Sequence, residues 1–131
     1  KLSKLKKLIF LISFIITYFY FFFCIKFLNF KEILHMIGSS KYRYFVKISH
    51  PVHFSRRLIL KMQDLLPRTT CLHKALIFKF IFRNDSKIKL LIGIKKGEGG
   101  LESHAWIERE GEVLINNLED LGSYNQIFCK Q

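Results

Sequence analysis

Acidic residues and cysteines are scarce in this chain, and each scarcity excludes some classes of protein or partner. Asp and Glu number 10 against 22 Lys and Arg, giving a formal net charge of +12. This balance favours anionic partners, such as a membrane surface, nucleic acid or an acidic peptide. The three cysteines, Cys24, Cys71 and Cys129, form no Cys-x-x-Cys pair, so we expect neither a disulfide framework nor a zinc site. Such cysteine usage fits a reducing cytosol.

A recognisable nucleic-acid-binding module is also lacking. Basic and aromatic residues do not interleave along one face, as they would in such a protein, so we expect no nucleic-acid partner. We expect no metal and no cofactor either. At 131 residues the chain has room for one domain, or one small domain with an appendage, and no second catalytic domain fits.

One long apolar run occupies residues 8–25, which include neither a charge nor a helix breaker over 18 positions. As an α-helix it would extend about 27 Å, just long enough for a bilayer core of about 30 Å. Lysines before the run and Lys26 after it permit an anchor with its N-terminus inside, or a helix lying on the membrane surface. A buried helix covering the rest of the protein is the alternative. The bulky residues 26–30 argue against a cleaved secretory signal.

The apolar positions of residues 30–37 have helical spacing, and Gly38-Ser39-Ser40 ends the pattern. We therefore predict an N-terminal apolar helical segment over residues 1–40 and a second domain over residues 41–131. Residues 41–49 alternate weakly, so a short strand and a loop compete there. Residues 52–66 fit a helix, with Ser55 as a candidate cap.

The second domain is expected to contain a helix followed by antiparallel strands. Thr70 is a candidate N-cap, which leaves Cys71 in the first turn of a helix that continues over residues 72–82. Alternating patterns then predict strands over three ranges, the last two joined by a hairpin at Glu110-Gly111: residues 87–94, 102–109 and 112–116. The fold class is α+β, with the cysteine-bearing helix packed on an antiparallel sheet.

Cys71 and His104 form a plausible nucleophile and base. Free backbone N–H groups and the helix dipole stabilise a thiolate at a helix start. His104 heads a strand 33 residues later, where an imidazole can take up a proton and return it to a leaving amine. His104, Trp106 and Glu108 share one strand face. Each residue also has a structural interpretation: a small buried cysteine, a sheet histidine and a core tryptophan.

Several short motifs over roughly residues 55–120 together resemble one family. They are Cys71-Leu72-x-x-Ala75-Leu76, Ile92-Gly93-Ile94, Ser103-His104-Ala105-Trp106-Ile107-Glu108, and Gly111. The chain resembles the transglutaminase-like, microcin J25-processing family of lasso-peptide biosynthesis. The resemblance implies a transglutaminase/papain-like core and a leader peptidase that cuts a ribosomal precursor peptide, then passes the core to a separate ring-forming macrolactam synthetase.

The family's third catalytic residue is usually an aspartate about a dozen residues after the histidine, whereas this chain has Asn116 there, with Asn117 beside it. By resemblance to papain-like enzymes, an amide oxygen can orient the imidazole. A three-residue hairpin loop would place Asn116 opposite Trp106, and a two-residue loop would place Asn117 opposite His104. Family spacing favours Asn116. Asp120 is a fallback, and both asparagines also suit turns.

These observations lead to a cysteine endopeptidase in bacteriocin maturation, with the Cys71 N–H as first oxyanion donor. Residues 1–50 are too short and aromatic for the leader-binding domain that some relatives carry fused, so a separate leader-binding protein is expected. The location is cytoplasmic, at the inner face of the membrane. The alternatives are a non-catalytic membrane-associated scaffold with a decayed transglutaminase-like fold and, third, a cross-linking transglutaminase that uses the same catalytic groups.

Overall fold

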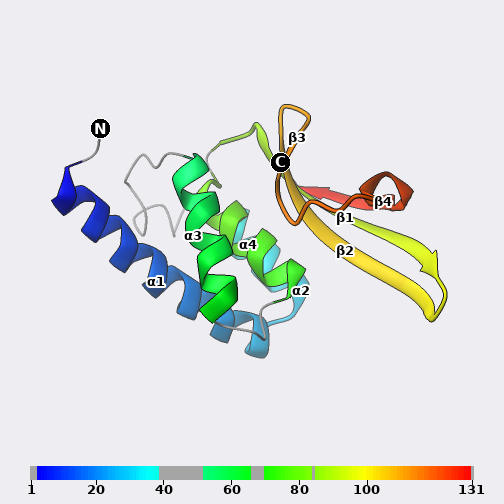
Figure 1. Cartoon of the computed structure of the whole chain (residues 1–131). Coiled ribbons are helices and arrows are strands. Elements are labelled where there is room, and N and C mark those ends of the chain that lie inside the picture. Colours follow the sequence, from blue (N-terminus) through cyan, green and yellow to red (C-terminus); the bar gives the residue numbers. More distant parts are fainter. Residues whose placement is uncertain (1–2, 39–51, 66–69, 84, 131) are drawn as a thin grey trace. The chain divides into compact units, whose positions relative to one another are not determined.

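The computed structural model describes residues 3–38, 52–65, 70–83 and 85–130 (Figure 1). The chain divides into two compact units between Ser55 and Arg56, and each unit is described by itself. Helices come first and an antiparallel sheet follows, so the predicted α+β class is confirmed. The predicted boundary between residues 40 and 41, and the strand or loop over residues 41–49, lie outside the described residues.

Within residues 3–38 the first unit forms helices α1 (Lys4–Phe27) and α2 (Phe30–Gly38), which contact each other. The break between them has a local cause. The Asn29 side chain accepts a hydrogen bond from the Glu32 N–H at 2.9 Å, and the Glu32 carboxylate accepts one from the Asn29 N–H at 3.0 Å. This reciprocal capping box satisfies two backbone donors and fixes the start of α2.

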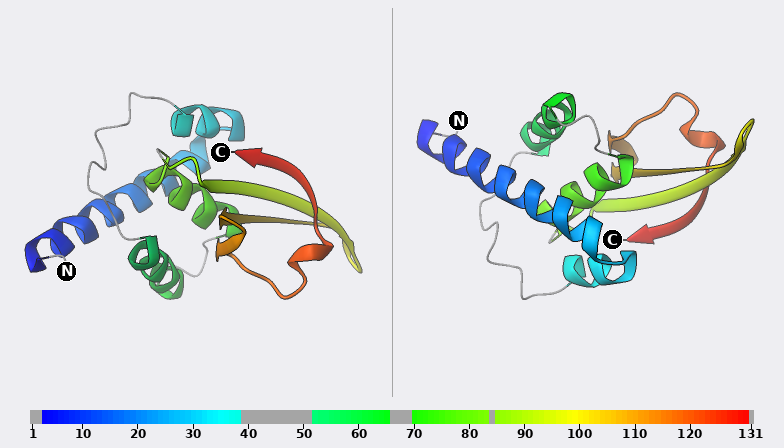
Figure 2. Two further views of the ribbon diagram at one scale, coloured as in Figure 1. Left: turned by 90° about the horizontal axis from the view of Figure 1, so that it is seen from above. Right: turned by 90° about the horizontal axis from the view of Figure 1, so that it is seen from below.

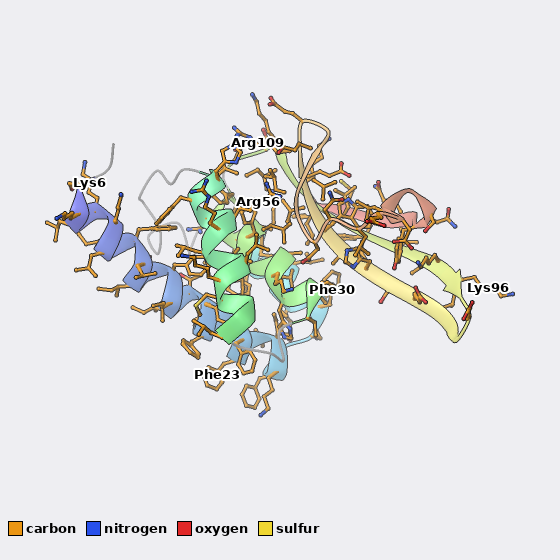
Figure 3. The ribbon with its side chains drawn as sticks, viewed as in Figure 1. Lys6, Phe23, Phe30, Arg56, Lys96 and Arg109 are labelled. Atoms are coloured by element: carbon orange, nitrogen blue, oxygen red, sulfur yellow. The ribbon has the colours of Figure 1, made fainter. Side chains whose placement is uncertain are left out.

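Helix α1 has two apolar faces. One face buries Phe10, Phe14, Tyr18 and Phe21, which recur at helical spacing. The opposite face exposes large apolar side chains, and Figure 3 shows Lys6 and Phe23 towards opposite ends of the helix. The exposed residues are Leu5, Leu8, Ile9, Ile12, Ile16, Phe19, Phe23 and Phe27. The helix is long and apolar enough to cross a membrane, and only 28% of its most apolar window is buried within the protein.

Helix α3 (Val52–Leu65) begins earlier than its expected cap. Ser55 therefore lies inside the helix, and the prediction that it caps the N-terminus was wrong. The residue is fully buried, and its hydroxyl has no hydrogen-bond partner among the residues that the structure describes. The apolar pattern that predicted this helix already begins at Val52, before the polar residue Ser55 that resembled a cap.

The second unit contains a four-stranded sheet with the order β3-β2-β1-β4, in which every neighbouring pair is antiparallel. The strands are β1 (Ile88–Gly97), β2 (Gly100–Arg109), β3 (Glu112–Ile115) and β4 (Asn125–Lys130). Strands β1 and β2 form a long curved hairpin (Figure 2), with Lys96 near its tip (Figure 3). Strand β4 was not predicted from the sequence.

Helix α4 (Cys71–Ile81) packs against β1 and β2 and is buried from Lys74 to Ile81. Ala75, Leu76 and Phe78 are completely inaccessible. Lys79 is also buried and donates a hydrogen bond to the Ile88 carbonyl, while burial lowers the pKa of its ammonium group. Close packing on the sheet makes this helix a rigid base for the residue at its more exposed start.

The β2–β3 hairpin combines a short turn with a register shift. Glu110 (φ 51°) and Gly111 (φ 83°) both have positive φ, as the favoured two-residue hairpin turns require. Arg109 pairs with Glu112, but after a bulge Ile107 pairs with Ile115. The loop has two residues, but the register that we expected of a two-residue loop was wrong, because the bulge gives the pairing expected of a three-residue loop.

Candidate active site

Thr70 begins the helix that carries the cysteine. Its hydroxyl oxygen accepts a hydrogen bond from the His73 N–H at 3.3 Å, and the Thr70 N–H donates to His73 Nδ1 at 3.1 Å. The predicted N-cap is thus present, within a capping box whose second member, His73, sequence reasoning missed. A Thr-x-x-His pattern could have revealed it, although Glu and Gln are the usual partners.

Cys71 is the first residue of α4 and is partly exposed. Its N–H group belongs to the first turn, where no acceptor exists within the helix. The residue is therefore not sealed in the core, and it combines a partly exposed position with a backbone N–H that no carbonyl of its helix can accept.

His104 lies on β2 opposite Gly93 of β1 and is half-buried. Its ring stacks on Trp106, with centroids 6.2 Å apart and planes at 16°, and contacts Tyr124 at 5.6 Å. The Trp106 indole donates to Glu108 at 2.9 Å, as expected for alternate residues on one strand face. Trp106 is 5% exposed, so it is a core residue that also supports the imidazole.

The imidazole of His104 is held by the main chain of Asn116. His104 Nε2 lies 2.7 Å from the Asn116 carbonyl oxygen. A carbonyl only accepts hydrogen bonds, so Nε2 must carry the proton, and Nδ1 is then the basic nitrogen of the neutral ring. Sequence reasoning placed Asn116 beside His104 but expected its amide oxygen to make this contact.

The Asn116 side chain makes a different set of contacts. Its amide nitrogen donates to the Cys71 carbonyl at 2.7 Å and to the Ala105 carbonyl at 2.8 Å. Its backbone has φ 61°, a left-handed conformation that asparagine adopts more readily than most residues. Asn116 therefore connects the start of α4, strand β2 and the His104 ring.

The two other candidates for the third position have other surroundings. Asn117 is exposed. Asp120 forms an ion pair with Lys95; the hydrogen bond from Lys95 is the main reason that the pKa of Asp120 is lowered, and the charge of His104 contributes less. Lys95 also pairs with Glu102 at 3.3 Å and lies over the Tyr124 ring. Asp120 is thus engaged by a lysine.

A metal centre has no support in the described part of the chain, where no three His, Cys, Asp or Glu side chains group to hold an ion. The model of the transglutaminase-like superfamily matches residues 47–129, more than half of the sequence. The chain belongs to the transglutaminase-like superfamily. This superfamily match spans Cys71, His104 and Asn116. Neither a curated protein nor a solved structure matches the chain significantly.

Proposed function

We propose that this member of the transglutaminase-like superfamily is a cysteine endopeptidase that removes the leader from a ribosomal precursor peptide during lasso-peptide biosynthesis. The observation that carries the proposal is the contact set of Asn116, which bonds the Cys71 carbonyl through its side chain and the His104 ring through its main chain. Nucleophilic catalysis needs this kind of fixed relation between a cysteine and a base. The lasso-peptide substrate rests on the sequence motifs.

The proposed reaction proceeds by acyl transfer. His104 Nδ1 takes the proton from the Cys71 thiol, and the thiolate attacks the scissile carbonyl to form a C–S bond. The Cys71 N–H stabilises the resulting oxyanion. The C–N bond then breaks as the imidazolium gives its proton to the departing amine. Water, activated by the same imidazole, hydrolyses the thioester and restores the thiol.

A thiol-directed probe tests this pairing without knowledge of the substrate. Iodoacetamide labelling at neutral pH, followed by mass mapping, should modify Cys71 faster than Cys24 and Cys129. Replacement His104→Ala should remove this preference, because the imidazole no longer favours the thiolate. Equal, slow labelling of all three cysteines in the unmodified protein would contradict a peptidase.

Three protein or peptide partners follow from this proposal: the precursor peptide, a separate leader-binding protein and a ring-forming macrolactam synthetase. The first unit, Lys1–Ser55, has two described helices, and neither sequence nor structure assigns it a leader-binding role. We expect the purified chain alone to bind a leader peptide weakly. Tight binding by the isolated chain would remove the need for a separate leader-binding protein.

We also place the protein in the cytoplasm at the inner face of the membrane. Helix α1 exposes a broad apolar face, and the described residues of this helix include Lys4, Lys6, Lys7 and Lys26 but no acid. Apolar side chains between basic ends suit an anionic lipid surface. The buried stripe along the opposite face favours a helix that lies on the membrane, with one side packed in protein.

The same exposed face supports a second candidate function, a membrane-associated scaffold without catalysis. The asparagine at the position where the family usually has aspartate is consistent with it. The thiol experiment separates the candidates, because a scaffold requires no fast labelling of Cys71 that depends on His104. Transglutaminase cross-linking differs from hydrolysis only in the nucleophile that enters the acyl-enzyme, and an added primary amine would reveal it.

A further inference from the structure

Asn116 presents its main chain and its side chain to different partners. The carbonyl oxygen faces His104 Nε2 at 2.7 Å, while the side-chain nitrogen faces the carbonyls of Cys71 and Ala105 at 2.7 and 2.8 Å. Both hydrogens of the amide are therefore used, and both go to acceptors. In this arrangement the side-chain oxygen of Asn116 does not orient the His104 imidazole.

We infer that Asn116 is a positioning residue that orients His104 through its backbone carbonyl, and that its side-chain amide ties the start of α4 to β2. The inference depends on the proposed function for its catalytic meaning, but its geometry can be tested alone. The left-handed backbone at φ 61° turns the carbonyl towards the ring immediately after β3 ends at Ile115. The positioning depends on this backbone conformation.

A carboxylate cannot replace this amide. Aspartate has nearly the same shape, but an ionised carboxylate only accepts hydrogen bonds. In Asn116→Asp it would face the two carbonyl oxygens of Cys71 and Ala105, which would repel it and separate α4 from β2. This chain should therefore reject the residue that its family usually has at this position.

Glycine provides the matched comparison. Asn116→Gly loses both amide donors but keeps the carbonyl and adopts the left-handed backbone without strain. It should preserve the orientation of His104 while weakening the link to α4. If the side chain oriented the ring instead, glycine would be the damaging substitution and aspartate the tolerated one. The two hypotheses therefore predict opposite orders of damage for these substitutions.

The decisive measurement is the tautomer of His104, read from long-range ¹H–¹⁵N correlations of histidine-labelled protein, with His104→Ala assigning the signal. We expect the Nε2–H tautomer in the unmodified protein and in Asn116→Gly. In Asn116→Asp near neutral pH we expect a mixture of tautomers instead of one. The Nδ1–H tautomer in the unmodified protein would overturn the inference. So would a tautomer kept by aspartate and lost by glycine.

Iodoacetamide labelling of Cys71 supplies the second readout. We expect Asn116→Gly to slow the labelling less than Asn116→Asp, which should slow it by about tenfold or more. The reverse order would overturn the inference. Failure of the proposed function looks different, because labelling of Cys71 would then not respond to His104→Ala, whatever the tautomer. The measurement on the unmodified protein remains decisive if a variant does not fold.

Discussion

Gly93 lies directly opposite His104 in the β1–β2 pairing, and the space above it is filled by two aromatic residues. A Cβ atom at this position would lie 3.0 Å from the Trp106 ring and 3.0 Å from Tyr124 Cβ. Both of these residues contact the His104 ring. The absence of a side chain at Gly93 thus allows the aromatic support of the imidazole to form.

The first prediction concerns this close packing. Gly93→Ala should displace Trp106 or Tyr124 and lower the free energy of unfolding by about 1–3 kcal/mol, the usual cost of overpacking. Labelling of Cys71 should slow as well. Chemical denaturation measures the first effect. Gly99→Ala is the matched control, because nothing lies within 4 Å of its added Cβ. Equal stability of the two variants would contradict the packing argument.

The second prediction concerns the His73 cap. The Thr70 N–H and hydroxyl both lie within hydrogen-bonding distance of His73 Nδ1, and burial lowers the pKa of His73 below 6.5. The unfolded state then binds a proton more readily than the folded state. This contribution to stability is present above pH 6.5 and is lost as the pH falls through the lowered pKa.

His73→Gln tests that cap, because glutamine is a neutral capping-box partner. Its free energy of unfolding should fall less between pH 7 and pH 5 than that of the unmodified protein, because glutamine takes up no proton in this range. Thermal or denaturant unfolding at several pH values gives the slopes. Parallel slopes for the two proteins would exclude His73 as their source.

The third prediction compares Asn116 and Asp120, two candidates for the residue that orients His104. Asp120→Asn should change Cys71 labelling by less than about threefold, since Asp120 pairs with Lys95, which offsets the effect of its charge on His104. Asn116→Ala should have a larger effect, because alanine adopts the left-handed backbone at φ 61° less readily than asparagine, so the carbonyl would turn away from His104. A stronger effect of Asp120→Asn would assign the orienting role to that carboxylate.

The fourth prediction uses the single tryptophan of the chain. Because Trp106 stacks on His104, loss of the imidazole in His104→Ala should change the fluorescence emission of the indole at a fixed pH. His73→Gln replaces a histidine of α4 and is the control, which should leave the emission unchanged. Equal emission from His104→Ala and the unmodified protein would show that the indole does not sense this ring.

The fifth prediction concerns the exposed face of α1. Ile16→Glu should lower binding to vesicles of anionic lipid by at least about tenfold, since burial of one such side chain contributes about 1.5–3 kcal/mol. Vesicle cosedimentation measures the effect. Leu101→Glu makes the same chemical change at a residue that is 79% exposed on β2 and should bind normally. Binding unaffected by Ile16→Glu would exclude this face.

Local patterns predicted much of the second unit. The α4 helix, its Thr70 cap and the three strands β1, β2 and β3 follow from signals that act over a few residues. Strand β4 was missed because it is mostly exposed and lacks the clear alternation of a half-buried strand. Tyr124, which precedes it, was missed with it.

The contacts of Asn116 required information that the sequence did not reveal. Family spacing selected Asn116, whose carbonyl contacts the His104 ring, but the bulge between Glu108 and Ile107 could not be inferred from loop length. The left-handed backbone after β3 determines which atoms of Asn116 face His104 and Cys71. Such a choice between main chain and side chain depends on three-dimensional packing, because both offer polar atoms at the same sequence position.

The bulge in the β2–β3 hairpin also affects how relatives should be compared. A relative without the extra residue would keep the two-residue turn and the pairing beyond it, so the residue that contacts the imidazole would follow the histidine by eleven positions instead of twelve. Counting twelve positions from the histidine would then select a residue with no access to the imidazole. Alignments of this superfamily should therefore be anchored on the turn and the extra residue together.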